Sequence, residues 1–102
     1  MDVRNAEPVM NDQKQMQVEV QIHNKQGLHA RPVMKFVDTA NRFRSSISVR
    51  RGERMVDGKS PMEMMLLEAV QGTRLTLIAK GQDASQLIDA LVQLVESRFD
   101  EE

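Results

Sequence analysis

The chain has 102 residues, a formal net charge of −1 and 3% aromatic residues, with no Trp or Tyr. This composition suits one small domain and argues against a nucleic-acid surface, which needs a basic field or aromatic side chains that stack on bases. The absence of cysteine excludes disulfides and thiol chemistry, and the lack of any acidic residue between His23 and His29 argues against a metal site.

No apolar run is long enough to span a membrane, and the N-terminal residues lack the hydrophobic core of a signal peptide. We therefore expect a cytoplasmic protein that does not insert into membranes and needs no cofactor, with the monomer as its simplest state. Residues 1–16 are polar and aperiodic, so we expect them to form a disordered extension ahead of a single domain over residues 17–102.

The domain begins with a predicted strand over residues 18–22. Its apolar positions alternate with polar ones, which is typical of a strand with one buried face. The chain leaves the strand through His23, whose simplest interpretation is a solvated side chain at the strand end.

The stretch Gly27-Leu28-His29-Ala30-Arg31-Pro32 joins this strand to a predicted helix. Pro suits a first helical turn because its missing N–H would have no partner there, and the free N–H groups of that turn favour an anion. Arg31 adds a guanidinium that suits phosphate or carboxylate oxygens, and His29 adds an imidazole, which is a nucleophile near pH 7. The combination indicates a phosphoryl acceptor, and the competing interpretation of His29 is a solvated or helix-capping residue.

The predicted helix covers residues 30–43, where apolar residues recur at helical spacing and Phe36 and Phe43 are expected to fill the core. The positions expected on its buried face are Ala30, Val33, Met34, Val37 and Ala40. Two short strands are predicted next, over residues 46–50 and 55–56, joined by a hairpin turn. The arginines around this hairpin are expected on a solvated surface, with docking of an acidic partner as the alternative.

A second helix is predicted to begin at Ser60-Pro61-Met62-Glu63, because Ser is a favoured N-cap, Pro fits the first turn and the Glu completes a capping-box pattern. Apolar residues surround this helix almost completely. Burial of the stripe Met64, Leu67 and Val70 leaves Met62 and Met65 at or near the surface, which is typical of an adaptable docking surface. The alternative is that these methionines fill the core loosely.

A fourth strand is predicted over residues 74–80 and a last helix over residues 84–95, closed by Phe99, while the acidic residues 100–102 are expected to be frayed. The order of elements is βαββαβα. It predicts an α/β (α+β) fold, an open-faced two-layer β-sandwich in which three helices cover one face of a four-stranded antiparallel sheet.

Together these motifs resemble the histidine-containing phosphocarrier family, HPr, of the bacterial phosphoenolpyruvate:sugar phosphotransferase system. The stretch 27–32, followed by Phe36-Val37, is similar to the family's active-site signature. Gly58-Lys59-Ser60 ahead of a Met-rich helix is similar to its regulatory serine site. The turns at 71–73 and 81–84 match glycine-containing turns later in the family's sequences. The resemblance covers about residues 17–99.

The resemblance implies a phosphoryl carrier rather than an enzyme, in which His29 accepts a phosphoryl group on Nδ1 from enzyme I and passes it to enzyme IIA domains. The backbone amides of Ala30 and Arg31 and the Arg31 side chain would hold the phosphoryl oxygens. Gln26 stands where the family more often has a small polar residue, and its amide is placed to reach the same group.

The resemblance also implies that an HPr kinase/phosphorylase phosphorylates Ser60, which would place charge beside the methionines and block docking of enzyme I. Pro61 and Glu63 depart from the family pattern at this site, and the alternative is that Ser60 serves only as an N-cap. Met62, Met65 and Pro61 fall where the family's docking patch lies.

Two other functions compete with the carrier. One is a regulatory docking module of the same fold that binds a transcription factor or an enzyme, and the presence of His29 with Arg31 favours the carrier over it. The other is a general ligand- or RNA-binding domain, against which the lack of aromatic residues and of a basic face counts.

Overall fold

The computed structural model describes residues 14–101, so the disordered extension predicted for residues 1–16 falls largely outside the described residues. The first strand begins at Gln15, two residues ahead of the predicted domain start at Gln17. Gln15 and Met16 extend it because they pair with Lys80 and Ala79 of the central strand, a long-range contact that local alternation does not reveal.

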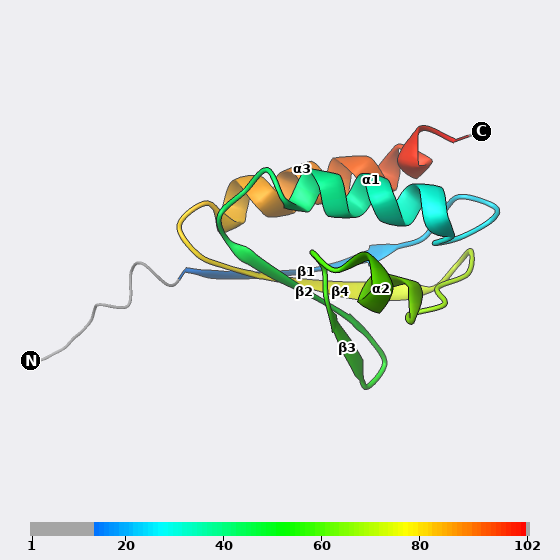
Figure 1. The fold of residues 1–102 in the computed structure, drawn as a ribbon, viewed down its shortest axis with the longest axis horizontal. Helices are drawn as coiled ribbons and strands as arrows, with labels where there is room; N and C mark the ends of the chain where they lie inside the picture. Colours follow the sequence, from blue (N-terminus) through cyan, green and yellow to red (C-terminus); the bar gives the residue numbers. More distant parts are fainter. Residues whose placement is uncertain (1–13, 102) are drawn as a thin grey trace, which may run out of the picture.

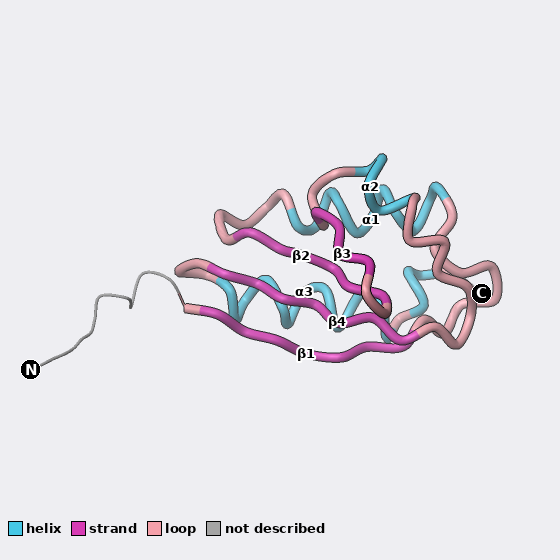
Figure 2. Tube along the Cα trace, turned by 90° about the horizontal axis from the view of Figure 1, so that it is seen from below, coloured by secondary structure: helices cyan, strands magenta, loops and turns pink. Residues whose placement is uncertain are grey.

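The predicted βαββαβα order is confirmed. The elements are β1 (Gln15–Gln21), α1 (Ala30–Ala40), β2 (Ser46–Arg51), β3 (Arg54–Asp57), α2 (Pro61–Met65), β4 (Arg74–Lys80), α3 (Ala84–Glu96) and a short turn over Arg98–Asp100. The strands pair antiparallel in the order β1-β4-β2-β3, so the last strand lies in the middle of the sheet (Figure 2).

The helices lie on one side of this sheet, as predicted, and leave its other face open (Figure 1). The long helices α1 and α3 cover the sheet, whereas the short α2 packs against α1 and the edge strand β3. In β2 and β4 alternate side chains are buried, whereas the edge strands β1 and β3 bury only Val20 and Val56, which suits a sheet with one solvated face. Within residues 14–101, no helix is long and apolar enough to cross a lipid bilayer.

The helices α1 and α2 are both shorter than their apolar patterns predicted. α1 ends at Ala40 rather than near residue 43, and Phe43 packs against the core from the following turn. Ala30 and Met34 were predicted on the buried face of α1, but both are exposed, because α1 buries the side centred on Val33, Phe36 and Val37.

α2 ends at Met65, after which the chain turns through Glu68 in a left-handed conformation with φ 50°. Helical spacing therefore no longer applies beyond Met65. Met64 and Leu67 are buried as predicted, but Val70 is 63% exposed, so the prediction that it joins the buried stripe was wrong.

Asp83 connects the turn before α3 to the loop before β2. Its Oδ1 accepts hydrogen bonds from the hydroxyl of Ser45 at 2.5 Å and from the backbone N–H of Ser45 at 2.8 Å, and its Oδ2 accepts from the N–H of Arg44 at 3.0 Å. The Ser45 hydroxyl and then the Arg44 amide favour the charged carboxylate and lower the pKa of Asp83 from 3.8 to about 2.

Candidate functional site

A glycine turn places the candidate nucleophile at the end of the sheet. Gly27 has φ +70°, and a Cβ built on it would lie 2.5 Å from the carbonyl oxygen of Ala69. The next residue, Leu28, donates its backbone N–H to that same oxygen at 2.8 Å. The turn before His29 is therefore pressed directly against the segment that follows α2, and only glycine fits there.

His29 is the N-cap residue of α1, with extended φ and ψ of −94° and −170°. His29 therefore occupies the predicted capping position, but its side chain makes no capping hydrogen bond to the helix. The His29 side chain is 35% exposed. A ring in this position is held by its neighbours yet open to an approaching group.

The first turn of α1 supplies groups that suit an anion. Ala30 and Arg31 are the first two helical residues, and helix geometry leaves their N–H groups without an intrahelical acceptor. Arg31 is exposed and Pro32 is buried, which matches the predicted proline in the first turn. Of these residues, Arg31 borders a hollow of about 510 Å³, whose lining residues are Lys25, Gln26, His29, Arg31, Asp100 and Glu101.

The hollow thus brings together the predicted residues His29, Arg31 and Gln26 with two acidic residues of the C-terminal tail. Its cationic side chains and free amides can hold phosphoryl oxygens, while the imidazole can form a bond to phosphorus.

The tail contact was not predicted. Glu101, expected to be frayed, forms a hydrogen bond of 3.0 Å between its Oε2 and Nε2 of His29, and its Oε1 accepts from Nδ2 of Asn24 at 3.1 Å. Asn24 is fully buried, and its Nδ2 also donates to the carbonyl of Gly27 at 2.8 Å. The only sequence signal for this arrangement was Phe99, an aromatic residue after the last helix, which is completely buried and anchors the tail.

Ser60 is the N-cap of α2, and its Oγ accepts a hydrogen bond from the N–H of Glu63 at 3.2 Å. The Glu63 side chain accepts from the backbone N–H of Asp57 at 2.9 Å, so it does not reach back to Ser60. Only half of the predicted capping box forms. The Ser60 side chain is partly exposed at the start of α2, immediately ahead of Pro61.

Between α1 and α2 lies a small apolar groove. Met62 is 82% exposed and Met65 is 44% exposed, so their predicted surface position is confirmed and the alternative that they fill the core is wrong. The groove has a volume of about 200 Å³ and is lined by Ala30, Val33, Met34, Pro61, Met62 and Met65. It joins the helix that begins at His29 to the helix that begins at Ser60.

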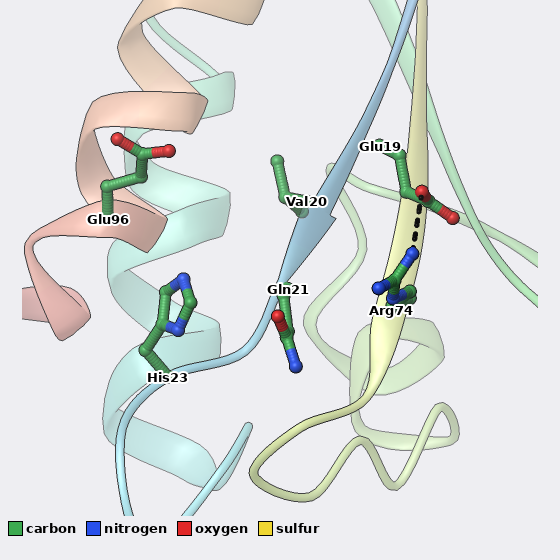
Figure 3. Close-up of a pocket in the computed structure, with 6 residues that line it drawn as sticks. All are labelled: Glu19, Val20, Gln21, His23, Arg74 and Glu96. Carbon is green, nitrogen blue, oxygen red and sulfur yellow. Dashed lines mark ion pairs between the residues drawn. The ribbon is translucent and has the colours of Figure 1, made fainter.

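The second histidine lies elsewhere, at a polar hollow of about 250 Å³ between β1, β4 and the end of α3 (Figure 3). There Arg74 forms an ion pair with Glu19 at 3.5 Å, and His23 lies near Glu96 on the other side of β1. His23 is half-buried rather than fully solvated, and its carbonyl accepts from Nε2 of Gln71 at 3.0 Å. Within residues 14–101, no three His, Asp or Glu side chains are arranged so that they could hold a metal ion together.

Comparisons with known proteins agree on one family. A family model described as the PTS HPr component phosphorylation site matches residues 16–97. The chain is 46% identical to the phosphocarrier protein HPr of Pseudomonas aeruginosa over 85 residues, which cover 82% of this chain and 94% of that protein. It is 40% identical to the phosphocarrier protein NPr of Shewanella violacea over 83 residues, which cover 81% of this chain and 91% of that protein.

A solved structure, HPr-C-His from Thermoanaerobacter tengcongensis, matches the fold with a TM-score of 0.83. The two sequences are 46% identical, and the match covers 85% of this chain and 98% of the other. The region matched by the family model includes both the His29 turn and Ser60.

Proposed function

The chain belongs to the HPr family of phosphocarrier proteins of the phosphotransferase system, and from this we propose that it accepts a phosphoryl group on His29 from enzyme I and passes it to enzyme IIA domains. The observation that supports this most directly is the position of His29. Its half-exposed ring stands at the start of α1, free of any capping hydrogen bond and beside Arg31. The carrier acts in the cytoplasm as a monomer and turns over no free substrate.

In the transfer, the lone pair on Nδ1 of His29 attacks the phosphorus atom held by the donor histidine of enzyme I. The new N–P bond forms as the donor's N–P bond breaks, and the donor ring recovers its electron pair. The amides of Ala30 and Arg31, with the Arg31 guanidinium, stabilise the charge spread over the phosphoryl oxygens. The Gln26 side chain, which lines the same hollow, adds a further donor. This reaction needs mainly alignment of the two histidines and stabilisation of charge. A small carrier can therefore provide one part of the site while the partner protein provides the rest.

The groove between α1 and α2 is the proposed docking surface for enzyme I and for enzyme IIA domains. Met62 and Met65 provide flexible, polarisable side chains that adapt to more than one partner, and Pro61 holds the start of α2 beside them. The groove borders α1 just beyond His29, so a partner seated on it reaches the imidazole at the same time.

Phosphorylation of Ser60 by an HPr kinase/phosphorylase is the proposed regulation of this surface. A phosphate adds roughly −2 charge directly before Pro61 and Met62, where it opposes docking of an apolar partner surface. Incubation with the kinase and ATP should add one phosphoryl group to the wild type and none to Ser60→Ala. Failure of both to gain mass would leave Ser60 as the N-cap that its bond to Glu63 already makes it.

The test of the carrier function is the intact mass of the protein after incubation with enzyme I and phosphoenolpyruvate, beside a His29→Ala control. We expect one added phosphoryl group that is labile in acid and absent from the control. If an enzyme I that phosphorylates another carrier adds nothing here, the protein is instead a regulatory docking module of the same fold, and binding to a transcription factor or an enzyme becomes the function to measure.

A further inference from the structure

The C-terminal tail reaches the imidazole through a conformation that the chain does not adopt by itself. Arg98, Phe99 and Asp100 have φ values of 59°, 56° and 60°, so three consecutive residues with side chains are left-handed. Each of these conformations is disfavoured for a residue with a side chain, because the Cβ comes too close to the following carbonyl oxygen. A chain end without tertiary contacts would relax from such a turn.

Two contacts hold the turn in place. The Phe99 ring is completely buried in the core, and Nζ of Lys35, on α1, donates a hydrogen bond at 2.6 Å to the Phe99 carbonyl. The tail therefore folds back over α1, the helix that begins at His29. Local strain that persists beside a reactive group is a common sign of a functional role.

Both carboxylate oxygens of Glu101 are engaged at the end of this turn. Oε2 lies 3.0 Å from Nε2 of His29, and Oε1 accepts the Asn24 amide. Asn24 is fixed in turn by its bond to the carbonyl of Gly27, within the same turn that positions His29. The Glu101 side chain is only 15% exposed, so water competes weakly for this pair.

The chemistry of this pair determines where the ring carries its hydrogen. An ionised carboxylate can only accept hydrogen bonds, so Nε2 of His29 must be the donor. In a neutral imidazole the other nitrogen, Nδ1, then keeps its lone pair. When Nδ1 bonds to phosphorus, the ring retains the hydrogen on Nε2 and becomes positively charged, directly opposite the carboxylate.

We propose that Glu101 is a positioning residue for His29, which holds the ring in the tautomer with hydrogen on Nε2 and stabilises the positive charge that the ring acquires on phosphorylation. No proton has to leave during the transfer. The inference deepens the proposed carrier function and rests on it.

The first test needs no partner protein. The ¹⁵N chemical shifts of the His29 ring in the unphosphorylated wild type should report a single tautomer with hydrogen on Nε2. In Glu101→Ala they should move toward the mixture seen for a free histidine, while Glu96→Gln, which removes a carboxylate of the same C-terminal segment beside the other hollow (Figure 3), should leave them unchanged. An unchanged tautomer in Glu101→Ala would overturn the positioning role.

The second test measures phosphoryl transfer from phosphorylated enzyme I with the carrier concentration varied. Glu101→Gln keeps an acceptor oxygen but removes the charge, so kcat should fall by about tenfold with KM unchanged. Glu96→Gln should match the wild type in both constants. Thermal unfolding of each variant shows whether the fold is intact.

The outcomes separate the two proposals. If the wild type is phosphorylated and Glu101→Gln transfers at the same rate, the charge-stabilising role of Glu101 is wrong and the carrier function stands. If the wild type itself gains no phosphoryl group from a competent enzyme I, the carrier function is wrong and this inference falls with it.

Discussion

At the scale of single residues, the position of His29 depends on the space beside Gly27. The backbone of that turn lies against Ala69 and Val70, and the Leu28 amide completes the contact. A side chain at residue 27 must push these two segments apart. The position of His29 therefore depends on residue 27 having no Cβ atom.

Gly27→Ala should destabilise the protein by about 2 kcal/mol or more, because the new methyl group meets the Ala69 carbonyl in addition to the cost of a positive φ. Gly52→Ala is the matched control, since Gly52 has φ +60° with no atom within 4 Å of the position that a Cβ would take, and it should cost about 1 kcal/mol. Urea unfolding measures both. Equal losses would show that the Ala69 contact does not constrain the turn.

Arg31→Ala should slow phosphoryl transfer by about tenfold or more while leaving the unfolding midpoint unchanged, because the guanidinium is exposed and, in the proposed mechanism, stabilises charge on the phosphoryl group. Arg42→Ala, an exposed arginine just beyond the end of α1, should transfer at the wild-type rate. Rapid-quench transfer assays with phosphorylated enzyme I measure the rate. A normal rate in Arg31→Ala would remove the guanidinium from the mechanism.

At the scale of elements, the sequence predicted best where one local pattern decides the structure. β4 covers residues 74–80 as expected, and α3 begins at Ala84, because regular alternation or helical spacing persists over each whole element. The end of α2 could not be predicted in this way. Apolar residues continue past Met65, and burial of Leu67 and Ala69 comes from contacts with the rest of the fold rather than from helical spacing.

The same reasoning explains what was missed at the candidate site. Residues 26–32 are adjacent in sequence, so their meeting at one helix start follows from local structure. The contact between His29 and Glu101 joins residues 72 positions apart through a left-handed turn. Glu101 has the sequence of an exposed acidic tail, and only the burial of Phe99 and the bonds of Asn24 give it a fixed place.

The hydrogen bonds that Asp83 accepts from Arg44 and Ser45 make the stability of the fold depend on pH in a direction that can be predicted. The pKa of Asp83 falls from 3.8 to about 2 on folding, so its contribution to stability is complete above pH 3.8 and is lost as the pH falls through about 2. The free energy of unfolding, measured in urea between pH 5 and pH 2, should decrease less steeply with falling pH in Asp83→Asn than in the wild type. Asp89→Asn, at an exposed position of α3, should keep the wild-type slope.

At the scale of the whole molecule, the chemistry and the proposed docking surface gather at one end. The start of α1 and the C-terminal turn lie at one end of the molecule, whereas β1 begins at the opposite end (Figure 1). The groove that Met62 and Met65 line borders the first turns of α1. The sheet spans the distance between the two ends.

Replacing both Met62 and Met65 by Ser should raise the KM for enzyme I by about tenfold without changing kcat, because the change removes apolar docking area but no group of the reacting centre. Met16→Ser is the control, since Met16 is 39% exposed on β1, at the other edge of the sheet from α2. Titration of the initial transfer rate against carrier concentration gives both constants. A fall in kcat alone would place these methionines in the reaction rather than in docking.

Because the tail returns to His29, the two ends of the domain differ as attachment points for fusion partners and for immobilisation. A polypeptide that continues beyond Glu101 starts beside the imidazole, because the Glu101 side chain is bonded to the ring. One joined ahead of β1 starts at the far end of the sheet. We therefore expect a tag, a label or a further domain attached ahead of β1 to interfere less with access to His29 than one attached after Glu101.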